Sequence, residues 1–376
     1  MIAAPGDPSP RPWRAVVIGG NGNFGARICR DLAADDAIRA IAAARRVSRH
    51  AAGAEVEQAR LDLQAPDFAQ QLKRLTPALV IHCAGPFQGQ DYRVAEAALS
   101  AGAHYIDLAD GRDFVTGFAQ RFDSAARAAG VLMVSGASTV PALSSAVVDE
   151  LQGRFRKMEE IQVAIAPGQR APRGEATIAA VLSYAGKPFK WLRDGVWRDV
   201  WGWQELKRVR FAGLGQRWAA ACDVPDLALF PQRYPEVRTV EFRAALELAV
   251  QQFALWTGAA LRRAGLPLTL ERAARPLRRV ALLLDRFGTD HGGMLVSVTG
   301  VRRDGSRGRV EWHLTAQANH GPEIPCMAAT VLASKLARGD LPPPGAYPCV
   351  GLLRLAEFEP EFARWRISAS IEESSA

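Results

Sequence analysis

Short apolar runs alternate with segments of helical periodicity along the first 150 residues of the chain. Each run is rich in Val, Ile, Leu or Ala and stops at a turn signal, which predicts a strand. The predicted strands are Ala15–Ile18, Ile38–Ala44, Glu55–Leu63, Leu79–Ala84, His104–Leu108 and Val131–Ser135. Strands that alternate with helices in this way predict an α/β fold with a doubly wound parallel sheet.

The pattern changes beyond residue 150. A strand is predicted over Ile161–Ala166, and a polar turn between Gly292–Gly300 and Arg309–Ala316 predicts a β-hairpin. We therefore expect an inserted α+β domain with a mixed or antiparallel sheet. Helices over Pro322–Ala337 and Glu357–Trp365 follow, and a polar frayed tail ends the chain. The predicted organisation is a flexible tail (1–13), a Rossmann domain (14–150), a substrate or oligomerisation domain (151–318) and C-terminal helices that return to the Rossmann domain (319–376).

A strongly apolar stretch covers residues 244–261, and Arg262 and Arg263 follow it. Its uncharged part, Leu248–Leu261, has 14 residues, fewer than the roughly 20 that a bilayer-spanning helix needs. A buried helix is the favoured interpretation. A peripheral membrane contact through 244–265 stays open, because a basic cluster comes next. The cluster consists of Arg272, Arg275, Arg278 and Arg279.

A glycine-rich turn joins the first predicted strand to the first predicted helix. Gly20, Gly22 and Gly25 fit the pattern G-x-G-x-x-G. In dinucleotide-binding folds, these glycines allow a tight turn, close approach of a pyrophosphate, and close packing of helix on strand. The pattern occurs here in the required order of strand, turn and helix. It therefore predicts a dinucleotide site, with an ordinary strand-to-helix turn as the alternative.

The end of the second predicted strand indicates which dinucleotide is bound. An acidic residue there hydrogen-bonds the ribose 2′-hydroxyl of NAD, whereas arginine accommodates the 2′-phosphate of NADP. This strand ends in Arg45 and Arg46 and has no acid at that place. NADP is therefore the expected cofactor, and NAD is the less favoured one. Asp62, at the end of the third predicted strand, is expected to contact the adenine.

Ligands of doubly wound sheets lie beyond the carboxyl ends of the strands. That edge is expected to include a loop after the fourth strand and two acids after the fifth. These residues are Gly85, Pro86, Phe87, Asp107 and Asp110.

Composition narrows the choice of function. The formal net charge is +8, but no nucleic-acid motif accompanies it, so either anionic ligands or an arginine-biased genome explains the charge better than nucleic-acid binding. The five cysteines are scattered and show no C-x-x-C spacing, which argues against a disulfide framework or a zinc site and is typical of the cytoplasm. No metal site is predicted. Tryptophans 191, 197, 201 and 203 are expected in the core or at an oligomer interface, such as that of a homodimer.

Three stretches resemble the saccharopine dehydrogenase-like NADP-binding family. They are VVIGGNGNFGARICRDLA (Val16–Ala33), VIHCAGPFQGQDYRVAEAALSAGAHYIDLAD (Val80–Asp110) and GASTVPALSSAVVDEL (Gly136–Leu151). Later segments resemble an uncharacterised bacterial branch. The resemblance implies a Rossmann domain, an inserted substrate domain, and NAD(P)-linked chemistry on an imine or an amine. The carboxylate clamps of true saccharopine reductases have no counterpart that aligns here, so the substrate is unidentified.

The resemblance also assigns residues. Gly20, Asn21, Gly22, Asn23, Phe24 and Gly25 match the family's phosphate loop, and Gly85, Pro86 and Phe87 match its nicotinamide-side loop.

The acid/base candidates are His320, Asp107 and Asp110, and Arg173 is a candidate clamp for a substrate carboxylate or phosphate. The sequence favours an NADP-dependent oxidoreductase with a small-molecule substrate. A non-catalytic NADP-binding or membrane-associated module is the alternative.

Overall fold

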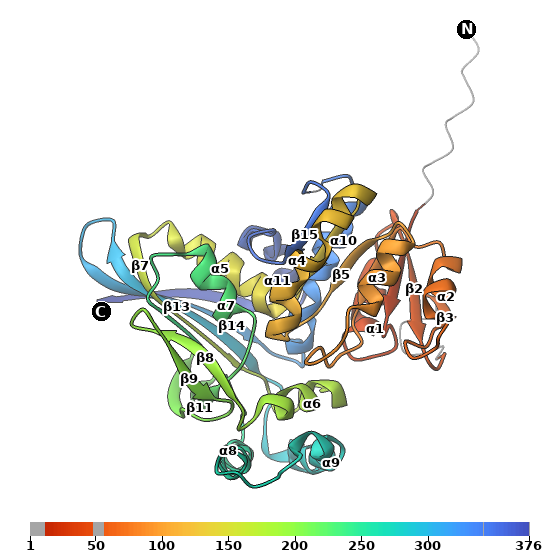
Figure 1. Ribbon diagram of the computed structural model, residues 1–376. Helices are drawn as coiled ribbons and strands as arrows, with labels where there is room; N and C mark the ends of the chain where they lie inside the picture. Colours follow the sequence, from red (N-terminus) through yellow and green to blue (C-terminus); the bar gives the residue numbers. More distant parts are fainter. Residues whose placement is uncertain (1–11, 48–55, 341, 376) are drawn as a thin grey trace.

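The structure is a computed structural model that describes residues 12–47, 56–340 and 342–375. The predicted flexible tail (1–13) thus lies almost wholly outside the described residues, as does Glu55, where the third strand was expected to begin. The chain forms two bodies that lie side by side, and each is built on one sheet (Figure 1).

The first body is the predicted doubly wound sheet. Its seven strands are all parallel, in the order β15-β6-β5-β4-β1-β2-β3. The strands are β1 (Trp13–Ile18), β2 (Ile38–Ala44), β3 (Glu57–Arg60), β4 (Leu79–His82), β5 (His104–Asp107), β6 (Leu132–Ser135) and β15 (Gly345–Pro348). The fold-class prediction is confirmed. Strand β15 was missed, because the prolines at 342–344 indicate the end of regular structure.

Alternate side chains of the buried strands fill both faces of this sheet, as a doubly wound fold requires. Ala15 and Val17 of β1 belong to the core shared with α1 and α10, whereas Val16 and Ile18 belong to the core shared with α2, α3 and α4. The helices are α1 (Gly25–Ala33), α2 (Phe68–Arg74), α3 (Arg93–Ser100), α4 (Arg112–Ala129) and α10 (Ile324–Ala337), the last preceded by the 3₁₀ turn η4 (Gly321–Glu323).

The second body is a nine-stranded sheet in which β12 and β7 pair in parallel and the other neighbours are antiparallel. The predicted mixed sheet and the β13–β14 hairpin are confirmed. The strands are β7 (Phe155–Ala166), β8 (Pro188–Arg193), β9 (Val196–Trp201), β10 (Lys207–Phe211), β11 (Gly215–Ala221), β12 (Thr239–Ala245), β13 (Gly292–Arg302), β14 (Arg307–Ala316) and β16 (Ser368–Ser375).

The helices around the second sheet connect the two bodies and lie partly on the surface of the second one. The predicted tryptophans of this body differ in exposure. Trp191 and Trp203 are fully buried core residues, whereas Trp197 is exposed. The helical segments are η1 (Thr139–Leu143), α5 (Ser144–Gln152), α6 (Glu175–Tyr184), α7 (Asp226–Arg233), α8 (Ala249–Arg263), η2 (Leu270–Ala273), α9 (Ala274–Leu284), η3 (Asp285–Phe287), η5 (Leu355–Glu357) and α11 (Glu359–Arg364). One apolar core runs from β1 through α5 into β7 and β13, so the two bodies are packed together.

Two expectations from the sequence are wrong. The polar end of the chain is not frayed: β16 pairs with β14 along its whole length, because backbone hydrogen bonds need no apolar side chains. The apolar stretch 244–261 is not one buried helix either. Its first residues, Ala244 and Ala245, end β12, and helix α8 buries only Gln252 and Ala259.

Candidate functional site

The turn between β1 and α1 has the steric features that its glycines predict. A Cβ on Gly20 would lie 2.7 Å from Cα of Ala42, and one on Gly25 would lie 2.2 Å from the carbonyl oxygen of Gly19. Both positions thus exclude any side chain. Gly22 is more open, since its Cβ would meet only the oxygen of Gly19, at 3.0 Å. The backbone at Gly22 is therefore the part of the turn that a ligand can approach.

The N-terminus of α1 is suited to an anion. Its N-cap residue is Phe24, no side chain caps it, and its first turn contains no acidic residue. The first N–H groups of a helix and the positive end of its dipole attract phosphate when nothing else satisfies them. Beside them, the buried Oδ1 of Asn21 has no hydrogen-bond partner among the described residues. This turn fits the pyrophosphate of a dinucleotide.

The residues predicted to contact the adenosine, namely Arg45, Arg46 and Asp62, lie at the carboxyl ends of the neighbouring strands β2 and β3. Asn21 donates a hydrogen bond from Nδ2 to the backbone oxygen of Arg46 at 2.9 Å, which ties the phosphate loop to the end of β2. The side chains of Arg45 and Arg46 are exposed there. Asp62 follows β3, the neighbour of β2, and its Oδ1 accepts a hydrogen bond from the backbone N–H of Gln64 at 3.0 Å.

The loop after β4 contains Gly85, Pro86 and Phe87. The side chain of Phe87 is buried and makes edge-to-face contacts with His82, at 5.0 Å between ring centroids, and with Phe114, at 5.4 Å. Phe87 therefore holds the loop in place from the core side. The sequence did not indicate the contact between Phe87 and His82, because no local pattern shows that His82 is buried. Burial lowers the pKa of His82 to about 4, so that its imidazole is neutral at pH 7.

Asp107 is the last residue of β5 and Asp110 follows it, but the two have different surroundings. Oδ1 of Asp107 accepts hydrogen bonds from the N–H groups of Ala109 (2.9 Å) and Gly136 (2.8 Å) and from the hydroxyl of Ser135 (3.0 Å). Burial raises the pKa of Asp107 to about 6. This carboxyl fixes the ends of β5 and β6, which is a structural role.

Asp110 lies nearer the second body. Its Oδ1 accepts a hydrogen bond from Nε2 of Gln88 at 3.1 Å, and burial raises the pKa of the carboxyl. The charge of Asp110 in turn contributes to raising the pKa of Tyr184 and of Cys222, after the larger effect of their burial. Tyr184 and Cys222 belong to the second body, and Arg112, two residues beyond Asp110, pairs with Asp223 of that body, so Asp110 lies next to the junction of the two.

Further polar groups at this junction escaped the sequence analysis. Tyr184 Oη lies 2.8 Å from Sγ of Cys222, and the guanidinium of Arg112 pairs with the carboxylate of Asp223 at 2.6 Å. Arg112 also donates to the backbone oxygen of Lys190 at 3.0 Å. Each contact joins segments that are far apart in the chain. No local spacing could have revealed them.

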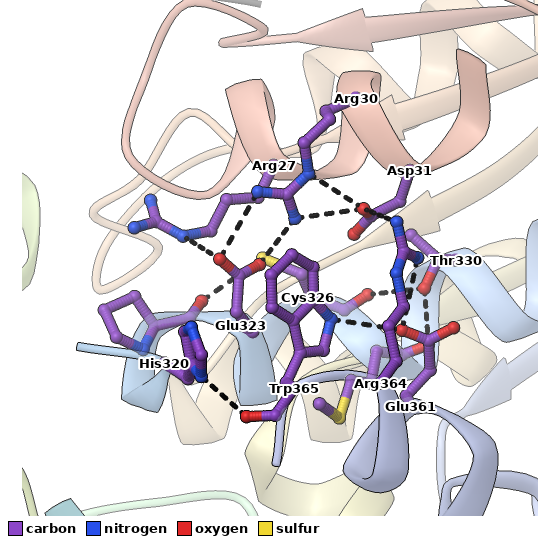
Figure 2. Close-up of polar contacts among 12 residues, drawn as sticks. Arg27, Arg30, Asp31, His320, Glu323, Cys326, Thr330, Glu361, Arg364 and Trp365 are labelled. Atoms are coloured by element: carbon purple, nitrogen blue, oxygen red, sulfur yellow. Dashed lines mark hydrogen bonds and ion pairs between the residues drawn. The ribbon is translucent and has the colours of Figure 1, made fainter. Parts of the chain in front are cut away.

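His320 lies in a different cluster, at the start of η4 (Figure 2). Its Nδ1 is 2.6 Å from the backbone oxygen of Trp365, and the two rings are in edge-to-face contact. Nearby, the buried carboxylate of Glu323 pairs with Arg27 at 3.0 Å and Arg30 at 2.7 Å, which fastens the start of α10 to α1. Among the described residues, no hydrogen bond or ion pair links His320 to Asp107 or Asp110.

The guanidinium of Arg173 already has partners within the protein. Its guanidinium pairs with Asp285 at 2.5 Å and donates to the backbone oxygen of Gln169 at 2.5 Å. A carboxylate clamp at this position would have to displace Asp285. The residue before it, Pro172, accepts a hydrogen bond from Asn23, so the segment does lie beside the turn between β1 and α1.

One group of potential metal ligands occurs in the described part of the chain, formed by Glu311, His313 and Glu372. Nδ1 of His313 accepts a hydrogen bond from the N–H of Ala212 at 3.3 Å, so the neutral ring carries its proton on Nε2, which faces Glu311 at 3.7 Å. That nitrogen has no lone pair for a metal, and Arg210 pairs with Glu372. The arrangement is an ion network.

Comparisons with known proteins agree with this geometry. Residues 15–149 match the family model described as "Saccharopine dehydrogenase NADP binding domain". No curated protein matches the chain in sequence. The solved structure of saccharopine dehydrogenase (L-Glu forming) from Saccharomyces cerevisiae is similar over 96% of this chain and 100% of that chain, with a TM-score of 0.69 and 12% identity. Homospermidine synthase from Legionella pneumophila, solved in complex with NAD, is similar over 97% and 91%, with a TM-score of 0.62 and 9% identity. At these identities the two structures establish a shared fold.

Proposed function

Because residues 15–149 belong to the saccharopine dehydrogenase-like NADP-binding family, we propose that this chain is an NADP-dependent oxidoreductase. It would transfer hydride between nicotinamide and an imine or carbonyl, or the corresponding amine or alcohol. The observation that carries the proposal is the turn from β1 to α1, where steric exclusion at Gly20 and Gly25 accompanies an uncapped helix N-terminus. That combination favours a pyrophosphate over an ordinary turn.

The choice of NADP over NAD rests on Arg45 and Arg46. Both side chains are exposed at the end of β2, and the backbone of Arg46 is fastened to the phosphate loop through Asn21. Guanidinium groups bind phosphate by paired hydrogen bonds, which suits the 2′-phosphate.

The bound nicotinamide would supply the hydride, and the chain would supply orientation, electrostatics and a proton. We assign the proton to Asp110. Oδ1 of Asp107 accepts three hydrogen bonds and the residue is fully buried, and His320 lies in a separate cluster. Asp110 lies next to the junction of the two bodies, and burial raises its pKa, which keeps a larger fraction protonated near neutral pH. A protonated carboxyl there can donate to an oxygen or nitrogen that gains negative charge.

A module that holds NADP without turnover is the competing candidate. One observation favours it, namely that the guanidinium of Arg173, the predicted substrate clamp, is paired with Asp285. The cytoplasmic location also stays a proposal. All five cysteines are free thiols, which suits a reducing compartment.

The two candidates are distinguished by turnover. Purified protein would be mixed with NADPH and a panel of imines, ketones and aldehydes, and loss of the reduced nicotinamide absorbance would be followed. Loss that depends on protein and on one substrate class supports the oxidoreductase. The reverse direction would be tested with NADP and the matching amines and alcohols. Tight NADPH binding with no turnover in either direction favours the module.

A further inference from the structure

Exposed apolar side chains are concentrated on α8, α9 and the segments next to them. Among the described residues, 13 large apolar side chains are strongly exposed, and nine of these lie between residues 250 and 287. The nine are Val250, Phe253, Leu261, Leu266, Leu277, Val280, Leu282, Leu283 and Phe287. We call these residues the α8–α9 face. Such a concentration marks an interaction surface, whereas single exposed apolar residues need no explanation.

Helix α9 presents its apolar stripe to solvent. Val280 and Leu283 are 52% and 74% exposed, and Pro276 lies on the same stripe, at the i, i+4, i+7 spacing of one helix face. The opposite side holds the helix to the protein. Ala274 is buried there, and the backbone oxygen of Ala281 accepts a hydrogen bond from Gln169 at 2.9 Å.

Helix α8 has the same arrangement. Val250 and Phe253 are exposed, whereas Gln252 and Ala259 are buried on the other side. In Figure 1, α8 and α9 both lie at the edge of the second body, away from the first sheet. The 3₁₀ turn η2 connects them: it packs on α9, and its Leu270 would lie 3.8 Å from a Cβ on Gly258 of α8.

The surface is basic as well as apolar, although one of its arginines, Arg275, pairs with Glu175 of α6 at 2.8 Å. Between residues 249 and 287 there are seven arginines and only two acidic residues. Both acids are paired: Glu271 with Arg262 at 3.0 Å, and Asp285 with Arg173 at 2.5 Å. The exposed arginines of this region are Arg263, Arg272, Arg275, Arg278, Arg279 and Arg286.

We propose that the α8–α9 face docks on an anionic lipid bilayer. Apolar side chains bordered by arginines favour insertion into the boundary between headgroups and acyl chains, with the guanidinium groups at the anionic headgroups. A second copy of the chain suits the surface less well, because a two-fold contact would bring the arginines of both copies into one interface. Within the described residues, no helix is long and apolar enough to cross a membrane. The contact is therefore with the membrane surface.

The test is co-sedimentation of the full chain with vesicles of phosphatidylcholine alone or mixed with phosphatidylglycerol. One variant combines Val280→Asp with Leu283→Asp, and a second combines Arg272→Glu with Arg279→Glu. The matched controls are Val196→Asp, at a valine that is 56% exposed on β9, and Arg198→Glu on the same strand. Thermal unfolding would establish that each variant is folded, which is expected because all the substituted side chains are exposed.

The wild-type chain is expected to bind the vesicles that contain phosphatidylglycerol and to be released by high salt. The apolar variant should lose roughly tenfold or more of the partition coefficient, and the charge variant roughly fivefold or more, with both controls unchanged. Failure of the wild-type chain to bind, or unchanged binding by both variants, would overturn the proposal. So would a dimer, detected by analytical ultracentrifugation, that the Val280→Asp and Leu283→Asp variant abolishes, because a second copy would then cover the face.

Discussion

Asn23 donates a hydrogen bond from Nδ2 to the backbone oxygen of Pro172 at 3.0 Å, which joins the phosphate loop to the second body. Its Oδ1 accepts a hydrogen bond from Arg27 at 2.7 Å, so the amide is held on both sides. We expect Asn23→Ala to weaken NADPH binding about fivefold, since one net hydrogen bond contributes about 1 kcal/mol to the ordering of the loop. Calorimetric titration measures this change. An unchanged dissociation constant would mean that the loop is ordered without this contact.

The arginines at the end of β2 should determine the choice of cofactor. Replacing Arg45 and Arg46 together with Ala is expected to weaken NADPH binding at least tenfold and to leave NADH binding within about twofold, because only NADPH has the 2′-phosphate. Arg39→Ala is the control, since Arg39 lies near the start of the same strand and is paired with Glu57. Equal losses for both nucleotides would contradict the assignment.

Asp110→Asn tests the proton donor. The amide keeps an oxygen that Gln88 can hydrogen-bond but cannot donate a carboxyl proton. We expect kcat to fall roughly 10²–10⁴-fold, while the Kd for NADPH stays within about twofold.

The pH dependence makes this test more specific. In the reductive direction, wild-type kcat should fall as the pH rises through the raised pKa of Asp110, and the Asn variant should lack that decline. Asp113→Asn, at an exposed carboxyl on the first turn of α4, is the control. Full activity of the Asp110 variant would rule out this residue.

Asp226 should make the protein less stable as the pH rises. It is buried, Ser144 donates to its Oδ1, and burial raises its pKa from 3.8 to about 7. Between these values the unfolded chain releases a proton that the folded chain retains. Its contribution to stability is therefore complete below about pH 4 and is lost as the pH rises through 7, a change of roughly 4 kcal/mol.

The Asp226→Asn variant lacks this titration. Urea unfolding at pH 4 and pH 8 should show the variant gaining stability relative to wild type at the higher pH. Parallel stability profiles for the two proteins would refute the prediction.

Local pattern was sufficient for strands β1 to β6 of the first sheet and for the glycine turn between β1 and α1. The run Ile38–Ala44 predicts β2 with its observed bounds, since a buried parallel strand is mostly apolar, here at every position but Arg39, and the run ends before Arg45 and Arg46. The same reasoning failed for α8, because an apolar helix that faces solvent has the same composition as one that faces a core. It failed for β16 because edge strands can be polar.

The junction between the two bodies was beyond sequence reasoning. Arg112 belongs to the first body and Asp223 to the second. Only the packing of α4 against the second body brings them together. Asp107 and Asp110 looked equivalent in sequence, three residues apart after one strand. Their surroundings distinguish them: Asp107 is enclosed by backbone donors, whereas Asp110 lies next to the junction.

The most direct test of the account is calorimetric titration of the wild-type protein with NADPH and, separately, with NADH. We predict one site for each chain, with an NADPH dissociation constant at least tenfold below that for NADH, because the 2′-phosphate adds contacts with arginine. If neither nucleotide binds, the turn from β1 to α1 is an ordinary connection and the proposed oxidoreductase function is wrong.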